Sequence, residues 1–359
     1  MGVLAAPTTI GLHISRPPGV FGDPTASRAQ PRGWDLLGNV PVPLRHLVRD
    51  GVAARVQPLR RDGHAPLKCC FPMGQGGASP FQRLRYIRAL DEFPHMLVSA
   101  EYGHCFNRAF HARHVEGGAF RAEQPNGVDA VFSEAGLIDP KGWIGVFAVA
   151  PFVFLIDRAR LGDLPVPRRW SDLADPIYAG QVVFGGWRRP GQSDYAGYNA
   201  FFLQAMAMEL GLGGVARILA NVPSLVHSAQ MPRLAGTDAS PGGIYVAPLS
   251  LADMCPRRHR TQLVWPEDGA LAFPLWLTVK RSQRLTLAPL VDYFHGPDLA
   301  RLLNANRYPA LCPGQKPAMP AWAKLKWPGW DYLRHGDCAA ELKAVRKLFQ
   351  HWQEHWACG

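Results

Sequence analysis

The feature that most constrains this chain is one long apolar segment near its middle, residues 144–156 (IGVFAVAPFVFLI), interrupted by Pro151. The segment exceeds a typical strand of about 5–6 residues and falls short of the ~18 apolar residues of a membrane span. We therefore expect a strand that passes from one sheet to another. The chain has 359 residues, more than one hydrophobic core usually spans, so two lobes are expected.

Predicted strands and helices alternate on both sides of this segment. Before it, strands are expected at residues 35–40, 67–71 and 96–99, and helices at 44–52, 81–90 and 106–115. After it, strands are expected at 181–184, 243–248, 262–265 and 273–279, and helices at 198–210, 285–294, 299–303 and 339–356. This alternation predicts parallel sheets with right-handed crossovers. Residues 1–33 are rich in Pro, Gly, Ser, Thr and Arg, which indicates a disordered or loosely attached arm.

The net charge of +11 is compatible with nucleic acid, a membrane surface or an anionic ligand as partner. The arginines are scattered and no basic helix is interleaved with aromatic residues, so we expect no nucleic-acid partner. No segment is long and apolar enough to suggest a membrane-spanning protein. The first residues lack the cationic start and apolar core of a secretory signal, and the seven cysteines are dispersed without a C-x-x-C pair. A reducing, cytoplasmic location is therefore compatible with the sequence.

One stretch, residues 165–187 (PVPRRWSDLADPIYAGQVVFGGW), reads as a single unit. Ser171 is a good helix N-cap residue, and the short helix after it should stop before Pro176, because a residue that precedes proline avoids the α region. Residues 181–184 then read as a buried strand that runs into Gly185 and Gly186. A strand that ends in a glycine pair is a place where an α/β sheet brings its backbone close to a ligand.

Loops that follow the predicted strands carry the candidate ligand-binding residues, because ligands of open α/β sheets bind at the carboxyl ends of the strands. The glycine-rich loop at 73–77 could bind an anion through its amide groups, and Arg188 offers bidentate pairing to carboxylate or phosphate. Each group of candidates also has a purely structural interpretation, which stays open. These interpretations are an ordinary glycine turn, a solvated basic turn, a capped helix start and, for Tyr245, a position in the core. The candidates are Pro41, Met73, Gly74, Gln75, Gly76, Glu101, Tyr102, Gly186, Trp187, Arg188, Ser228, Gln230 and Tyr245.

Other chemistry finds less support in the sequence. The absence of G-x-S-x-G, of the Rossmann pattern and of a Walker loop leads us to expect neither nucleophilic catalysis nor a cofactor. Histidines at 111/114 and 351/355 have helical spacing, but neither pair forms H-E-x-x-H. The segment 101–105 (EYGHC) is denser, and its carboxylate and phenolate suit iron(III). Whether a metal is bound stays open.

The stretch 165–187 resembles the W-x-D-L-x-D-P-x-Y-x-G signature of the solute-binding proteins of bacterial ABC importers, in the iron(III), polyamine and oxyanion group. Later segments resemble patterns of the same family in the same order, at residues 242–256 (GGIYVAPLSLADMCP), 265–270 (WPEDGA) and 290–298. The resemblance covers about residues 34–306. It implies an α/β fold of the type 2 periplasmic-binding-protein kind, with two lobes that are each a mostly parallel sheet flanked by helices.

The resemblance also implies how the chain is divided and what it does. Residues 34–148 and 262–300 would form lobe 1, and residues 149–261 and 301–359 lobe 2 with a C-terminal helix. The implied function is that of the substrate-binding component of an ABC importer, which is not an enzyme. It would capture a small anion, a metal ion or a metal complex by hinge closure, with an ABC permease as partner and a periplasmic location. The alternative is a cytoplasmic ligand sensor or enzyme on the same fold.

Departures from the family pattern limit the ligand assignment. Iron(III)-binding members carry a Tyr-Tyr pair just after the second lobe, and here that position, residues 245–248, reads YVAP. The two-tyrosine iron site is therefore missing. The acidic residues and aromatic box of polyamine binders have no evident counterpart. The tail at residues 309–359, which contains Trp322, Trp327 and Trp330, lies outside the common pattern.

Overall fold

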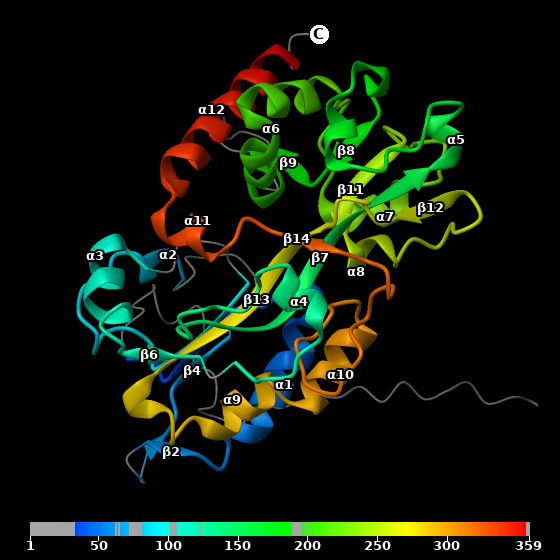
Figure 1. The fold of residues 1–359 in the computed structure, drawn as a ribbon. Coiled ribbons are helices and arrows are strands. Elements are labelled where there is room, and N and C mark those ends of the chain that lie inside the picture. The colour runs from blue at the N-terminus through cyan, green and yellow to red at the C-terminus, as the bar shows by residue number, and fades with distance from the viewer. Residues whose placement is uncertain are drawn as a thin grey trace, which may run out of the picture.

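The computed structural model describes residues 33–61, 63, 65–71, 81–100, 106–122, 124–188, 196–198 and 200–356. Within these residues, helices surround one large sheet, and two small sheets of two strands each lie beside it (Figure 1). Except for Gly33, the arm predicted at residues 1–33 lies outside the described residues.

The large sheet runs in the order β4-β1-β5-β13-β7-β11-β8. Strand β1 pairs in parallel with β4 and β5, and β11 pairs in parallel with β8, as expected for a mixed α/β fold. The long strands β13 and β7 are antiparallel to their neighbours in this order. The bounds are β1 (Leu36–Gly38), β4 (Cys69–Cys70), β5 (Met96–Ser99), β13 (Ala270–Lys280), β7 (Gly145–Asp157), β11 (Ile244–Pro248) and β8 (Val182–Phe184).

Seven short strands complete the β structure. Three of them extend the large sheet: β6 (Phe120–Arg121), β12 (Thr261–Val264) and β14 (Leu325–Lys326). The other four form the two small sheets: β2 (Arg60–Arg61) with β3 (Ala65–Pro66), and β9 (Gly186–Arg188) with β10 (Ala196–Tyr198).

Strand β7 is the long apolar segment, and all 13 of its residues are buried. It pairs with β13 from Gly145 to Phe152 and with β11 from Phe152 to Ile156. The segment was predicted to pass from one sheet to another, but β7 stays within one sheet and extends from its lower to its upper half. Figure 1 shows β7 and β13 running side by side between the lower and the upper half of the molecule.

Helices cover the sheet and bury its side chains in three hydrophobic clusters. In the lower half, α1 (Arg45–Val56), α9 (Ala288–Phe294) and α10 (Pro297–Ala305) pack on one face. In the upper half, α6 (Ala200–Ala220) and α12 (Cys338–Trp356) pack on β8 and β11. The stretch between α10 and α12 is called the C-terminal segment below. A third cluster lies under this segment and spans both halves. The boundary between lobes predicted at residue 300 falls inside α10, and the division into lobes stays a prediction.

The remaining helices are short. They are η1 (Val42–Leu44), α2 (Phe81–Leu84), α3 (Arg108–Phe110), the π-helix η2 (His111–Val115), α4 (Ala130–Glu134), α5 (Arg158–Leu161), η3 (Trp170–Ala174), η4 (Pro176–Tyr178), η5 (Ser228–Gln230), α7 (Met231–Leu234), α8 (Leu249–Ala252), η6 (Arg281–Gln283) and α11 (Trp330–His335). The helix predicted over 81–90 ends at Leu84, and turns follow it.

The stretch 165–187 folds as one unit, although its N-cap differs from the prediction. The 3-10 helix η3 begins at Trp170, before Ser171, and the Asp172 carboxylate accepts from the backbone N–H groups of Arg168 and Arg169 (2.8 and 2.9 Å). An aspartate can serve the start of a short helix in this way because its oxygens accept from N–H groups that have no helical partner. Trp170 is fully buried and donates to the Gly269 carbonyl (2.8 Å).

Helix α6 is, in the described part of the chain, the one helix long and apolar enough to cross a membrane. Half of its apolar window is buried inside the protein, and its conformation breaks at Gly211, with φ 69° and ψ 175°. Its buried face packs on α12 and η3. Burial against other elements of the fold is typical of the core helix of a globular domain.

Candidate ligand-binding edge

The strand register places the carboxyl ends of the two half-sheets opposite each other. Ser99, at the end of β5, pairs with Trp276 of β13, so β5 points along β13 toward the upper half. Pro248, at the end of β11, pairs with Phe152 of β7 and points toward the lower half. Both sets of carboxyl ends therefore face the middle of β7 and β13. We refer to this region as the ligand edge.

On the lower side of the ligand edge, the chain leaves β1 through Pro41. Pro41 is the N-cap residue of η1 and is half-buried. The half-buried Arg45 lies beside it and donates through Nε to the Val40 carbonyl (3.2 Å). Burial lowers the pKa of Arg45 from its ordinary value, although an arginine remains charged at neutral pH.

Arg45 is a candidate that the sequence analysis missed. Its position at the edge depends on the turn between β1 and α1, and helical periodicity does not reveal that turn. The other lower-side candidates, Met73, Gly74, Gln75, Gly76, Glu101 and Tyr102, lie outside the described residues.

On the upper side, Gly186 and the start of η5 lie together. The Gly186 N–H donates to the Val226 carbonyl (3.0 Å), and Gly185 forms a β-bridge with Val226. Ser228 and Gln230 follow in η5. The structure therefore places Gly186 beside the segment that leads into Ser228 and Gln230, and a ligand site shared by the three residues stays a prediction.

Strand β8 ends at Phe184, directly before the glycine pair, as predicted, and a separate strand, β9, begins at Gly186 and pairs antiparallel with β10. The side chains of Trp187 and Arg188 lie outside the described set. The capped helix start is His227 before η5, whose Nδ1 accepts from the Ala229 N–H (3.2 Å).

Tyr245 is the candidate that the structure corrects. Its side chain is fully buried in β11, and its hydroxyl shares a hydrogen bond of 2.7 Å with the Ser240 hydroxyl. Burial is the main cause that raises the pKa of Tyr245 to about 12. In this conformation the phenol offers no atom to a ligand, so Tyr245 is a core residue.

Metal-binding side chains do not gather in the described residues, where no group of three or more His, Cys, Asp or Glu could hold an ion. His111, one of the spaced histidines, instead pairs through Nδ1 with Glu116 (3.2 Å). The segment 101–105 lies outside the described residues.

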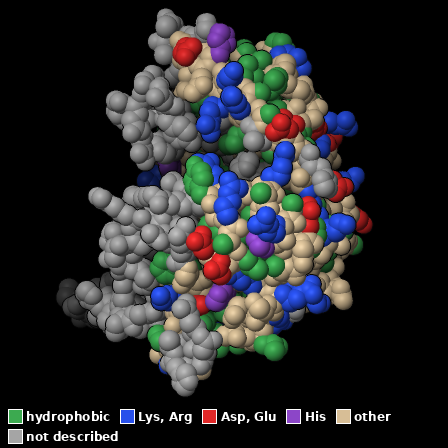
Figure 2. All heavy atoms as spheres, turned by 90° about the vertical axis from the view of Figure 1, so that its left-hand side faces the viewer, with side chains coloured by type: hydrophobic (Ala, Val, Ile, Leu, Met, Phe, Trp, Pro, Cys, Tyr) green, Lys and Arg blue, Asp and Glu red, His purple; other side chains and the backbone are tan. Residues whose placement is uncertain are grey.

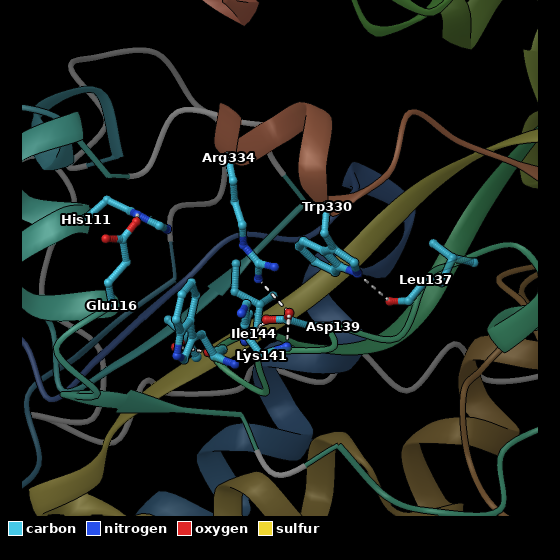
Figure 3. A network of polar contacts seen from close by, with 10 residues as sticks. His111, Glu116, Leu137, Asp139, Lys141, Ile144, Trp330 and Arg334 are labelled. Atoms are coloured by element: carbon cyan, nitrogen blue, oxygen red, sulfur yellow. Dashed lines mark hydrogen bonds and ion pairs between the residues drawn. The ribbon is translucent and has the colours of Figure 1, made fainter. Parts of the chain in front are cut away.

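The C-terminal segment links the two halves. On the lower half, Arg334 of α11 forms an ion pair of 2.5 Å with Asp139, and both side chains are buried. Figure 3 shows Arg334 reaching toward this carboxylate, with Trp330 beside it donating to the Leu137 carbonyl (3.3 Å). On the upper half, Gln204 of α6 donates to the Tyr332 hydroxyl (2.9 Å). The tail that had no predicted role therefore contacts both halves.

The described cavities lie away from the predicted residues. One of about 430 Å³ is lined by Asp35, Asp91 and His95 among others, at the amino ends of β1 and β5. Another of about 260 Å³ lies between α6 and the C-terminal segment. Basic side chains are spread over the face seen in Figure 2, with acidic ones among them, rather than gathered in one stripe. This distribution agrees with the scattered arginines of the sequence.

The family model of the bacterial extracellular solute-binding proteins matches residues 91–336. The chain belongs to this family. The solute-binding proteins of this family are ligand-binding rather than catalytic, in agreement with the resemblance found in the sequence. Comparison with curated proteins gives no match.

Solved structures with the same fold include iron-binding proteins. The Bordetella ferric binding protein is 16% identical with a TM-score of 0.55, over 89% of this chain and 99% of that one. The apo ferric ion-binding protein A of Pasteurella haemolytica is 15% identical with a TM-score of 0.58, over 89% and 97%. Iron-bound HitA from Pseudomonas aeruginosa is 13% identical with a TM-score of 0.54, over 87% and 98%. At these identities the likeness establishes the fold of this solute-binding protein.

Proposed function

We propose that this solute-binding protein captures a small anion, or a metal ion held with an anion, at the ligand edge and closes on it by a hinge motion. It then delivers the ligand to an ABC permease. The observation that carries the proposal is the register of β7 and β13. These two strands cross between the halves, and the carboxyl ends of β5 and β11 lie on opposite sides of one region.

The hinge follows from how few connections cross that region. Bending of β7 and β13 where Pro151 pairs with Ala272 would leave the helix packing of the two clusters, one in each half, in place. Hinge closure around a ligand typically uses a few such residues that absorb the backbone change. During closure, α11 would either exchange its contacts with the lower half or move together with that half.

The charge of the ligand is inferred from the edge itself. Arg45 stands on the lower side, half-buried, and Arg188 is carried by β9 on the upper side. Guanidinium groups pair with carboxylate and phosphate in a bidentate manner, and partial burial strengthens such pairs. Tyr245 is taken up by the core, which removes the position where iron-binding members carry a tyrosine pair. A ligand recognised mainly through its anionic groups fits these residues best.

Calorimetric titration tests the ligand class. The probes are inorganic phosphate, sulfate and ferric citrate, each added to the wild type and to Arg45→Gln and Arg188→Ala. Loss of one desolvated charge partner is expected to weaken binding of the recognised probe by about 2 kcal/mol or more. Arg49→Gln is the matched control, because Arg49 lies one turn further along α1 and pairs with Asp50 (2.7 Å). Unchanged affinity in both variants would remove the anion-binding role.

Periplasmic location and a permease partner are further parts of the proposal. They are supported by the extracellular description of the family that matches residues 91–336. A cytoplasmic ligand sensor on the same fold is the second candidate, favoured by the five described cysteines, which are all free and buried. A structure described as a two-component system protein in signal transduction also has this fold, with 11% identity and a TM-score of 0.56. Cell fractionation separates the two, because the transport proposal requires an exported pool.

A further inference from the structure

We propose that the amino-end pole of the upper half is a docking surface for anionic phospholipid. This surface, which we name the basic pole, comprises Arg158, Arg160, Arg233, Arg257, Arg258 and Arg260. Their elements, α5, α7 and the loop before β12, lie together on the right-hand side of the upper half in Figure 1. The inference is independent of the ligand proposed above.

Backbone contacts bring these arginines together from three separate segments. The Arg158 N–H donates to the Arg260 carbonyl (3.0 Å), where β7 ends beside the start of β12. Arg257 donates through Nη1 to the Arg233 carbonyl (3.0 Å). The cluster is therefore a property of the fold rather than of one basic run in the sequence.

Acidic residues only partly neutralise the basic pole. The segments 158–163, 233–240 and 253–260, together with Asp157, whose carboxylate accepts from the backbone N–H groups of Arg160 and Gly236, hold six arginines and four aspartates, an excess of two positive charges. Arg260 pairs with Asp238 (3.4 Å) and Arg258 with Asp253 (3.1 Å), yet the Arg258 side chain stays 70% exposed. Exposed pairs of this kind are weak, so their guanidinium groups remain available to phosphate.

An exposed apolar side chain in the same loop favours a lipid surface over a nucleic acid or an acidic protein. Met254 is 64% exposed, and Arg258 donates to the carbonyl of the preceding residue, Asp253 (2.9 Å). Basic groups around an exposed apolar side chain allow electrostatic attraction to anionic headgroups together with shallow insertion. A partner that binds through charge alone would make no favourable apolar contact with Met254.

The position of the basic pole is compatible with ligand capture. It lies where β7 ends and β11 begins, whereas the ligand edge lies at the opposite end of β11. A protein held at this pole would keep its ligand edge away from the lipid surface. Docking of this kind would keep the protein near a membrane both with and without its ligand.

Vesicle co-sedimentation tests the proposal with the full chain. Vesicles of phosphatidylcholine alone are compared with vesicles of equal parts phosphatidylcholine and phosphatidylglycerol, at low and high sodium chloride. We expect binding only to the phosphatidylglycerol vesicles, with loss at high salt. The triple variant Arg257→Gln, Arg258→Gln, Arg260→Gln should lower the partition coefficient about 100-fold. Met254→Ser should lower it by a smaller factor at unchanged charge.

The matched control removes the same charge elsewhere. Lys343, Arg346 and Lys347 are exposed on α12, and their triple replacement by Gln should leave vesicle binding within about 5-fold of the wild type. Equal loss in both triple variants would show that net charge alone acts and would overturn the proposal. Absence of binding, or tighter binding to duplex DNA than to the vesicles, would also overturn it. Arg258→Gln alone keeps the test valid should the triple variant fail to fold.

Discussion

Asp139 and Arg334 form the most deeply buried ion pair among the described residues. The two partners differ in how many further hydrogen bonds each of them makes. The Asp139 carboxylate also accepts from the backbone N–H groups of Lys141, Trp143 and Ile144 (2.8 to 3.0 Å). Arg334 stacks over the rings of Trp143 and Trp330, and its Nη1 has no hydrogen-bond partner in the described part of the chain. The aspartate organises a loop, whereas the arginine depends on the aspartate.

This asymmetry predicts unequal costs of substitution. Asp139→Ala leaves a buried guanidinium without its carboxylate and frees three N–H groups, so it should lower the free energy of unfolding by about 3–5 kcal/mol. Arg334→Met leaves the carboxylate with its three backbone donors. It should therefore lower the free energy of unfolding by a smaller amount, about 2 kcal/mol in total. Denaturant unfolding of both variants measures the difference. Equal losses would show that the loop hydrogen bonds contribute nothing to the role of Asp139.

Lys280 is a buried base, only 4% exposed, at the end of β13. Burial lowers the pKa of Lys280 from 10.5 to about 8, against the opposing effect of Asp91 and Asp35. Between these two pH values the unfolded chain binds more protons than the folded chain, so stability gains from this group as pH rises.

The corresponding prediction compares the wild type with Lys280→Met. The free energy of unfolding of the variant minus that of the wild type should be most positive below pH 8 and decrease toward pH 10.5. Buried thiols and phenols titrate in both proteins and cancel in this difference. Denaturant unfolding across this range measures it, and a difference that does not change with pH would contradict the assigned pKa.

Site residues proved only partly predictable from sequence. Loop positions after strands predicted Pro41, Gly186, Ser228 and Gln230, which lie near the carboxyl ends of the strands, and their binding role stays a prediction. Tyr245 was misassigned because β11 is an inner strand of the sheet whose residues 244–247 are buried on both faces, so its side chain is enclosed whichever face it lies on. Arg45 was missed because its place depends on the turn between β1 and α1.

At the scale of elements, the C-terminal helix α12 is joined to the upper half by its apolar face. Val345 and Phe349 are almost fully buried and pack in the same cluster as α6. Phe349 contacts the ring of Phe184 of β8, with centroids 6.4 Å apart. The helix is therefore part of the core rather than an appendage.

The prediction is that Phe349→Ala destabilises the protein by about 3–5 kcal/mol, because the cavity it leaves is fully enclosed. Lys347→Ala, on the exposed face of the same helix, should change stability by less than about 0.5 kcal/mol. Thermal or denaturant unfolding provides the measurement. A small effect of Phe349→Ala would show that α12 is detached in solution.

Elements with a strong pattern were predicted well, and weak ones were not. Strand β7 was predictable because a long apolar run buried on both faces has few alternatives. The helix predicted at 81–90 was too long, because residues 85–90 do not continue α2. The β9–β10 hairpin was missed because its glycines and arginines carry little strand propensity.

At the scale of the whole molecule, three connections join the halves: β7, β13 and the C-terminal segment. The two strands are continuous through the middle of the sheet, whereas the segment uses side-chain contacts of Trp330 and Arg334. The proposed hinge motion would leave the cluster of α1, α9 and α10 and that of α6 and α12 intact, and would rearrange the third cluster, which spans both halves. The central claim is that this arrangement serves to hold one small ligand between the halves.

Native mass spectrometry with elemental analysis, on protein purified without added ligand, tests that claim most directly. The account predicts a mass excess of one small ligand per chain, lost on denaturation, containing phosphorus, sulfur or a metal. Its occupancy should fall in Arg45→Gln and remain in Arg49→Gln. A ligand-free protein that also fails to bind phosphate, sulfate or ferric citrate would contradict the account, and so would an uncharged organic ligand.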